Sequence, residues 1–323
     1  MRAPARGALG AAVVLLVVTA PLPARAQMND LSGRGGPLTT RIEAALRAAS
    51  AGREGSRFRV VFGFEGLVPS DVQAGGSGGM VLQRYDSWSM GGFSGLLPVN
   101  EAWNRPGRTG TVLDLATMQP AAAQPAPVLQ TRPLLAFLEG RVRQGRARLE
   151  GVSIRLPQGR LALGERPLWW LGRIEGGEVY GWLDTSLRPD NAGGESGLRR
   201  DLTGLLSTLP GPGPVLERLT QLASTAPDLD VRRVAVRYLG RRPEETRPIL
   251  QRLFRDADDE QLRLEAMTGL LVRMEAGQVT WLAEVARTDP SLRLRREAIA
   301  ELGRSGDPQA RRILEEIVGI GRP

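Results

Sequence analysis

The residues that could carry chemistry are few, and the missing types exclude most catalytic classes. All 43 basic residues are arginine, and the chain contains no histidine, cysteine or lysine. The absence of histidine excludes a Ser-His-Asp triad and histidine-bound zinc. The absence of cysteine and lysine excludes thiol catalysis, a Schiff base and the lysine of a phosphate-binding loop. We therefore expect no enzyme, no cofactor and no metal site, and recognition through arginine or aromatic side chains.

Two patterns resemble catalytic or metal sites but fit structural roles better. Gly75–Gly79 matches the spacing of a nucleophile elbow, yet it lies in a run of glycine without a histidine partner, so we predict a loop. Asp256, Asp258, Asp259 and Glu260 form an acidic group that could bind calcium, but their spacing lacks the glycine and the distal glutamate of a calcium loop. The negative start of a helix explains this group better.

Aromatic side chains offer a second means of recognition. Trp169, Trp170, Tyr180 and Trp182 lie close together in the chain. They would form either a platform that stacks on sugars or peptides, or the core where two parts of the chain meet. The core is the commoner outcome for such a cluster, so we favour it.

Arginines gather in the last third of the chain, and several occur at positions 232, 233, 237, 241 and 242. Such a stripe is either a basic contact surface or a solvated helix face paired with nearby acids, and the second is the commoner outcome. We predict Arg233, Arg237 and Arg296 as partner-binding residues. A mild positive charge there would favour an acidic partner.

These arginines belong to a repeat. Segments 231–235, 262–266 and 294–298 each run from an aliphatic residue through an arginine and two variable positions to an alanine. A leucine follows four residues after each alanine, at Leu239, Leu270 and Leu302. A fixed period in the thirties indicates stacked helical units that bury their apolar faces against one another.

Each unit reads as a helical hairpin. In segment 228–255 the first helix has one apolar stripe, an N-cap at Asp228 and an end near Gly240, and a second helix starts at about Glu244. Asp258 or Asp259 should cap the equivalent helix of the next unit, and Ser291 that of the third. We expect close backbone contact at the repeated alanine. We also expect the repeated arginine to bond the capping carboxylate of an adjacent unit.

This segment resembles the HEAT repeat family, in particular its short, bilin-lyase-type HEAT-like repeats. The resemblance covers residues 195–319 and rests on the capping residues, the aliphatic-arginine pairs, the alanines and the leucines of the three copies. It implies a curved α-solenoid of about four hairpins that binds proteins, with the first helix of each hairpin on the concave side. It implies no catalytic residue.

The residues before the repeat show different sequence patterns. Residues 1–26 have a basic start, an apolar run and a small-x-small cleavage site, which predict a signal peptide. Residues 27–54 read as a leader and a short helix at 40–49. Residues 55–165 read as a β-rich module with Gly- and Pro-rich loops, including a strand at 58–64 and an extended linker at 119–127. Residues 166–194 would connect the β-rich module to the helical repeat or cap the end of the repeat. They would do so either as a half-unit or as a strand plus helix at 167–188.

Further strands are expected within the β-rich module. They are placed at 80–85, 93–97, 110–116, 142–149, 152–156 and 160–163.

Signal cleavage would remove Arg2, Arg6 and Arg25 and no acid, so the net charge would fall from +8 to +5. We expect an exported protein, periplasmic or secreted, with no transmembrane segment after cleavage. The arginines alternate with acids along the helices, which argues against nucleic acid as a partner.

Together these features predict an α+β multidomain protein, with a β-rich N-terminal module followed by a C-terminal α-solenoid. The expected function is a non-catalytic protein-protein interaction scaffold that docks another envelope or secreted protein. The alternative is a cell-envelope carbohydrate- or polymer-binding protein that uses the N-terminal module and Trp169, Trp170 and Trp182. A third class, bilin lyase, is suggested only by the name of the repeat and is not supported by any cofactor motif.

Overall fold

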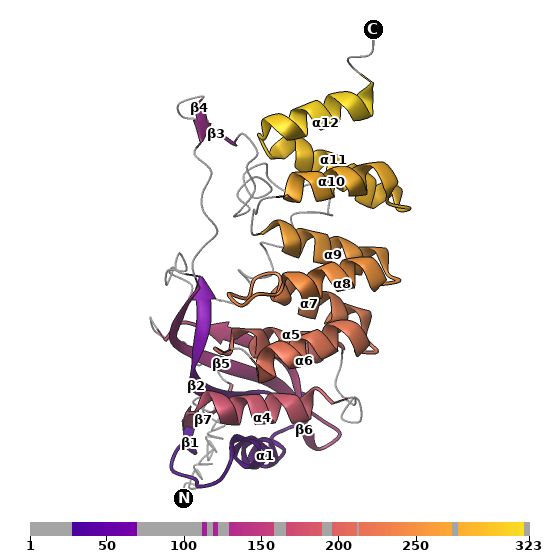
Figure 1. Cartoon of the computed structure of the whole chain (residues 1–323). Coiled ribbons are helices and arrows are strands. Elements are labelled where there is room, and N and C mark those ends of the chain that lie inside the picture. Colours follow the sequence, from indigo (N-terminus) through magenta and orange to yellow (C-terminus); the bar gives the residue numbers. More distant parts are fainter. Residues whose placement is uncertain are drawn as a thin grey trace, which may run out of the picture.

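The structure is a computed structural model that describes residues 28–69, 112–114, 119–121, 129–157, 166–188, 196–211, 213–272 and 277–319. Within these residues it is a mixed α/β fold with a five-stranded sheet and ten helices, and its C-terminal part is helical (Figure 1). The predicted signal peptide and the strands expected at 80–85, 93–97 and 160–163 lie outside the described residues.

The sheet has the strand order β1-β7-β2-β5-β6, made of β1 (Met28–Asp30), β7 (Leu168–Arg173), β2 (Arg57–Pro69), β5 (Leu129–Arg143) and β6 (Arg146–Arg155). β2, β5 and β6 pair antiparallel, whereas β7 is parallel to β2 and to β1. The strand predicted at 58–64 is confirmed as part of β2. A separate two-stranded ribbon joins β3 (Val112–Asp114) and β4 (Gln119–Ala121). β3 lies inside the strand predicted at 110–116, and β4 occupies the start of the predicted linker.

The strand predicted at 142–149 is wrong as one continuous strand: residues 142–143 end β5 and residues 146–149 begin β6, which also contains most of the strand predicted at 152–156. The chain instead turns at Gln144 and Gly145, which have φ angles of 54° and 67°. Glu54 fixes this turn because its carboxylate accepts hydrogen bonds from the backbone N–H groups of both residues, at 3.0 and 3.3 Å. Two long strands, β5 and β6, therefore form one hairpin in place of the small meander.

Three helices cover one face of the sheet (Figure 1). They are α1 (Leu38–Ala49), α4 (Gly176–Ser186) and α5 (Ser196–Thr208). The apolar side chains of β2, β5 and β7 on this face pack against them, and the resulting core continues without a break into the C-terminal helices. The opposite face carries a smaller apolar cluster around Val61 and Phe137. The short helix expected at 40–49 is confirmed as α1.

Two segments predicted as accessory take part in the sheet. β1 lies in the expected leader, and its partner β7 lies in the expected connecting segment. The alternative of a strand plus helix at 167–188 is confirmed as β7 and α4, but β7 is a sheet strand between β1 and β2. The sheet thus extends past the predicted boundary at residue 165.

The remaining helices follow in order along the stack in Figure 1. They are α6 (Pro214–Thr225), α7 (Leu229–Leu239), α8 (Arg247–Asp256), α9 (Glu260–Leu271), α10 (Gln278–Thr288), α11 (Leu292–Arg304) and α12 (Pro308–Val318). The predicted N-caps are confirmed, since Asp228, Asp259 and Ser291 accept hydrogen bonds from backbone N–H groups of α7, α9 and α11. None of the described helices is long and apolar enough to cross a bilayer.

The pairing of these helices differs from the predicted hairpins. The closest antiparallel pairs are α6 with α7, α8 with α9 and α10 with α11, and each is joined by the short turn that holds the N-cap. Segment 228–255 therefore spans two neighbouring pairs. α7, the second helix of its pair, also packs against α5 and against α9, the second helix of the next pair.

Two glycines form a close backbone approach between stacked pairs. A Cβ atom built on Gly240 would lie 2.5 Å from the Cα atom of Gly269, and one built on Gly269 would lie 3.0 Å from the Cα atom of Gly240. Ala235, Ala266 and Ala298 of the repeat are fully buried. The sequence located the small core residues of the repeat but not this glycine contact.

Candidate functional site

The three predicted partner-binding arginines lie on two helices of the stack. Arg233 and Arg237 are on α7, and Arg296 is on α11. Arg233 and Arg296 occupy equivalent positions, because each is five residues after its N-cap, Asp228 or Ser291. We call the surface formed by Arg233, Arg237 and Arg296, together with the side of α9 that lies between α7 and α11, the arginine strip.

Two of the three arginines are bound within the chain. Nη2 of Arg233 lies 3.3 Å from both carboxylate oxygens of Asp259, the N-cap of α9. Nη2 of Arg237 lies 2.7 Å from Glu265 of α9, and both side chains are largely buried. These ion pairs connect α7 to α9, so the two arginines have a structural role whatever else they contact.

Arg296 differs from them. Its side chain is exposed, and within the described part of the chain it forms no hydrogen bond or ion pair. Its neighbours on α11 are paired: Arg293 with Glu260 at 3.7 Å, and Arg304 with Glu297 at 3.5 Å. Among the described residues Arg296 is thus the exposed arginine of the strip whose side chain has no partner, and the neighbouring Arg295, which is half-exposed, has none either.

A polar ladder joins the N-termini of the stacked helices. The Ser196 hydroxyl of α5 donates to the carboxylate of Asp228, and the Ser291 hydroxyl donates to Glu260. Arg263 of α9 pairs with Asp289 in the turn before α11. The predicted bond between an arginine and the capping carboxylate of an adjacent unit is present at Asp259. Its donor, however, is Arg233, the residue after the repeated Arg232. Repeated Arg232 and Arg263 donate their Nε–H groups to carbonyls of the preceding helix, at 3.2 and 2.8 Å.

Asp228 gives this ladder a pH dependence. Burial raises the pKa of its carboxyl, but hydrogen bonds from Ser196, Asp230 and Val231 and the charge of Arg199 outweigh burial and hold the pKa below its ordinary value. The ionised form is therefore favoured in the folded state. This stabilisation is fully present above the unfolded pKa of 3.8 and is lost as the pH falls through the lower folded pKa.

We expect Asp228→Asn to reduce the drop in stability between pH 5 and pH 3, about the range in which a depressed aspartate titrates. Urea unfolding at a series of pH values measures this. Exposed Asp256→Asn serves as the control. A pH profile that is the same in Asp228→Asn and in the parent protein would contradict the role of Asp228.

The tryptophan cluster is part of the core. Trp169 and Trp182 are each 6% exposed, and their rings meet Phe58 and Phe62 edge to face with centroids 6.1 Å apart. Trp170 points to the opposite face of the sheet, where it packs half-buried near Val61. The favoured interpretation is confirmed for Trp169 and Trp182, and the three tryptophans do not form one platform.

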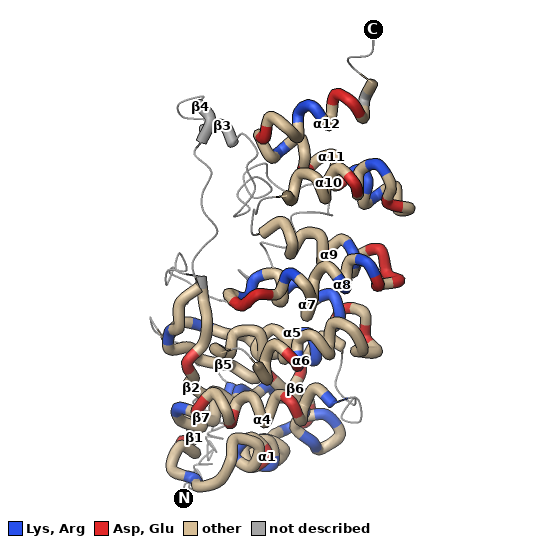
Figure 2. The backbone as a smooth tube through the Cα atoms, in the orientation of Figure 1, with Lys and Arg blue, Asp and Glu red and all other residues tan. Residues whose placement is uncertain are grey.

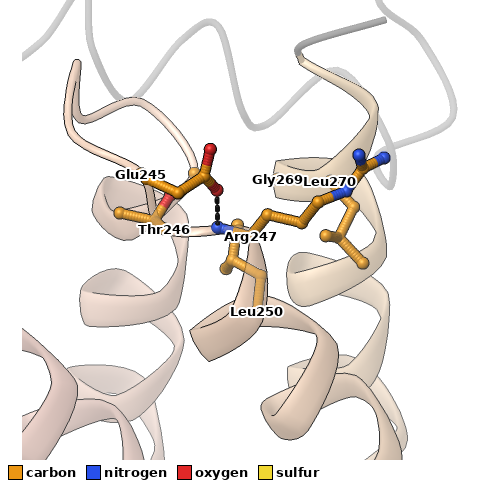
Figure 3. Close-up of a pocket in the computed structure, with 7 residues that line it drawn as sticks. Glu245, Thr246, Arg247, Leu250, Gly269 and Leu270 are labelled. Carbon is orange, nitrogen blue, oxygen red and sulfur yellow. Dashed lines mark hydrogen bonds between the residues drawn. The ribbon is translucent and has the colours of Figure 1, made fainter. Parts of the chain in front are cut away.

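A small pocket lies beside the glycine contact (Figure 3). The side chains of Glu245, Arg247 and Leu270 border it, and the Glu245 carboxylate accepts a hydrogen bond from the backbone N–H of Arg247 at 2.8 Å. The cavity volume is about 10 Å³. That is close to the space of one water molecule, so we assign the pocket no organic ligand.

The acidic group at 256–260 serves the start of α9. Asp259 caps the helix and Glu260 lies in its first turn. No cluster of three or more potential metal ligands occurs in the described ranges.

Sequence reasoning missed the most buried cation of the residues that the structure describes. Arg242 is 2% exposed and donates to three backbone carbonyls, one in the last turn of α5 and two in the connection to α6. Its position beside the glycine turn gave no signal, because the carbonyls that it binds lie more than thirty residues earlier in the chain.

Comparison with family models, curated proteins and solved structures gave no match. The functional assignment therefore rests on this chain's own residues.

Proposed function

We propose that the chain is an exported, non-catalytic scaffold whose helices α5–α12 form a HEAT-like solenoid and dock another envelope or secreted protein. The observation that supports the solenoid is repetition of the same contacts. Each N-cap turn joins an antiparallel pair, and each pair is tied to the next through caps, arginines and carboxylates. Interactions between sequence neighbours are what a solenoid requires.

The contact surface of this scaffold is the arginine strip, centred on Arg296. A side chain that is exposed and has no described partner loses no internal bond when it binds a carboxylate of another protein. Arg233 and Arg237 are poor choices for a binding test, because reversing their charge would place a carboxylate against Asp259 or Glu265. Such variants would lose stability and obscure any effect on binding.

We expect Arg296→Glu to reduce capture of the main partner at least tenfold, since a bound carboxylate would then meet a like charge. The measurement is capture from envelope extract with the full chain, followed by mass spectrometry and titration of the captured protein. Arg312→Glu, an exposed change on α12, is the matched control. Equal capture by the parent and both variants would remove Arg296 from the site while leaving the solenoid untouched.

A further inference from the structure

A second charged surface lies at the far end of the molecule, where α1, β5 and β6 meet. Residues 47–57 and 141–150 contain seven arginines and only two glutamates, Glu54 and Glu150. The whole chain has a net charge of +8, so most of the surplus positive charge falls in these two segments. Figure 2 shows blue segments near α1 and β6.

The fold brings the two segments together. The Ser50 hydroxyl accepts a hydrogen bond from the backbone N–H of Ala147 at 2.9 Å, and Glu54 binds the β5–β6 turn. Glu54 is occupied by these backbone groups. Glu150 pairs with Arg141 and Arg143, at 3.5 and 2.7 Å. Both glutamates are thus already engaged.

The strand register places like charges side by side. Arg57 of β2 lies opposite Arg141 of β5, and Arg141 lies opposite Arg148 of β6. Two residues further along β5, Arg143 lies opposite Arg146. Directly opposed like charges destabilise an antiparallel pair, so this arrangement is unfavourable for folding alone. Its cost falls when an anion lies over the row.

The outer arginines are available for such an anion. Arg53, Arg57, Arg146 and Arg148 are exposed, and among the described residues none of their side chains has a hydrogen-bond or ion-pair partner. They come from a loop and two strands and are spread along the end of the sheet. An extended surface with many phosphates satisfies dispersed guanidinium groups, each of which can bind a phosphate through two N–H groups.

We propose that this arginine end docks the molecule on an anionic phospholipid surface. The contact is electrostatic and peripheral: arginines lie at the headgroup phosphates, and no segment enters the bilayer. Docking through this end leaves the helical stack, which extends away from it in Figure 1, free to contact a protein. The inference does not depend on the proposed scaffold function.

The test is cosedimentation of the full chain with vesicles of phosphatidylglycerol and phosphatidylcholine, compared with pure phosphatidylcholine. We expect binding only to the anionic vesicles, weakened by salt. Arg57→Gln, Arg146→Gln and Arg148→Gln together should reduce the partition coefficient about a hundredfold, at roughly fivefold per arginine. The matched control replaces three exposed arginines of the helical stack, Arg252, Arg311 and Arg312, by glutamine.

Thermal unfolding separates function from structure. The triple variant at the arginine end should unfold at the same or a higher temperature than the parent, because like-charge repulsion is removed. Equal binding to both kinds of vesicle, or equal losses in the two triple variants, would overturn the proposal. So would full displacement of the protein from vesicles by polyglutamate or by inorganic phosphate at matched ionic strength, since the site would then be one for an acidic polypeptide or for free phosphate.

Discussion

Arg242→Met is expected to destabilise the protein by about 3–5 kcal/mol, the usual cost of breaking a buried charge network. The guanidinium donates to the carbonyls of Ser207, Leu209 and Gly211 at 3.1, 2.7 and 2.7 Å, and its Nε–H donates to Glu244 at 2.8 Å. Methionine fills a similar volume but satisfies none of these acceptors. The half-buried carboxylate of Glu244 and the three carbonyls would lose the hydrogen bonds that Arg242 donates.

Thermal unfolding measures this effect, and a fall in the midpoint of about 10 °C is expected for a chain of this size. The neighbouring Arg241→Met is the control. Its guanidinium lies over the ring of Tyr238, 5.9 Å from the centroid, and is more exposed. Removing that contact should cost only about 0.5–1 kcal/mol. A similar fall in the unfolding midpoint of both variants would contradict the stabilising role of the Arg242 hydrogen bonds.

Gly240→Ala is expected to cost about 1–3 kcal/mol, the usual price of overpacking a core. The new Cβ would lie 2.5 Å from the Cα atom of Gly269. Because the obstacle is backbone, no rotamer change can relieve it, and α7 and α9 would have to separate. The Arg237–Glu265 ion pair spans the same two helices and would be strained by that movement.

The control for this variant is Gly303→Ala on α11. Its Cβ would have no neighbour nearer than Leu314 Cδ1 at 3.9 Å. Alanine is the better helix former, so this variant should be unchanged or more stable by up to about 1 kcal/mol. Urea midpoints measure both. If the two glycine variants behaved alike, the contact between α7 and α9 would not be as close as described.

The helical part could be predicted because its signals are local. Asp228, Asp259 and Ser291 each cap the helix that begins at the next residue, and a capping bond spans two or three residues. The apolar stripes repeat with the same period. What the sequence did not reveal was the choice of packing partner, which depends on distances between helices.

The sheet was harder to predict for the same reason. β5 includes the run Leu134–Leu138, which is apolar on both faces and shows no alternation. β7 contains the tripeptide Leu171-Gly172-Arg173. The same Leu-Gly-Arg sequence occurs at the ends of α7 and α11, but in β7 it lies in a strand, with Gly172 at a φ of 89°. Its identity as a strand is decided by β1 and β2, far away in the sequence.

The positions of the candidate arginines on the helices were predicted in part. The strip at Arg233 and Arg296 could be placed because equivalent repeat positions lie on equivalent faces. The ion pairs of Arg233 and Arg237 could not, since Asp259 and Glu265 are 26 and 28 residues away. The arginine end was missed because its charges become neighbours only through the strand register.

The pairing of β1 with β7 has a consequence for how the chain reaches its fold. The first strand of the sheet finds its neighbour only once residues 168–173 have been made. Helices α7 to α12 pack mainly against elements close to them in sequence, and such local contacts form quickly. When the whole chain refolds, β1 should therefore become native more slowly than these helices pack, and a chain interrupted before residue 168 would lack the strand with which β1 pairs.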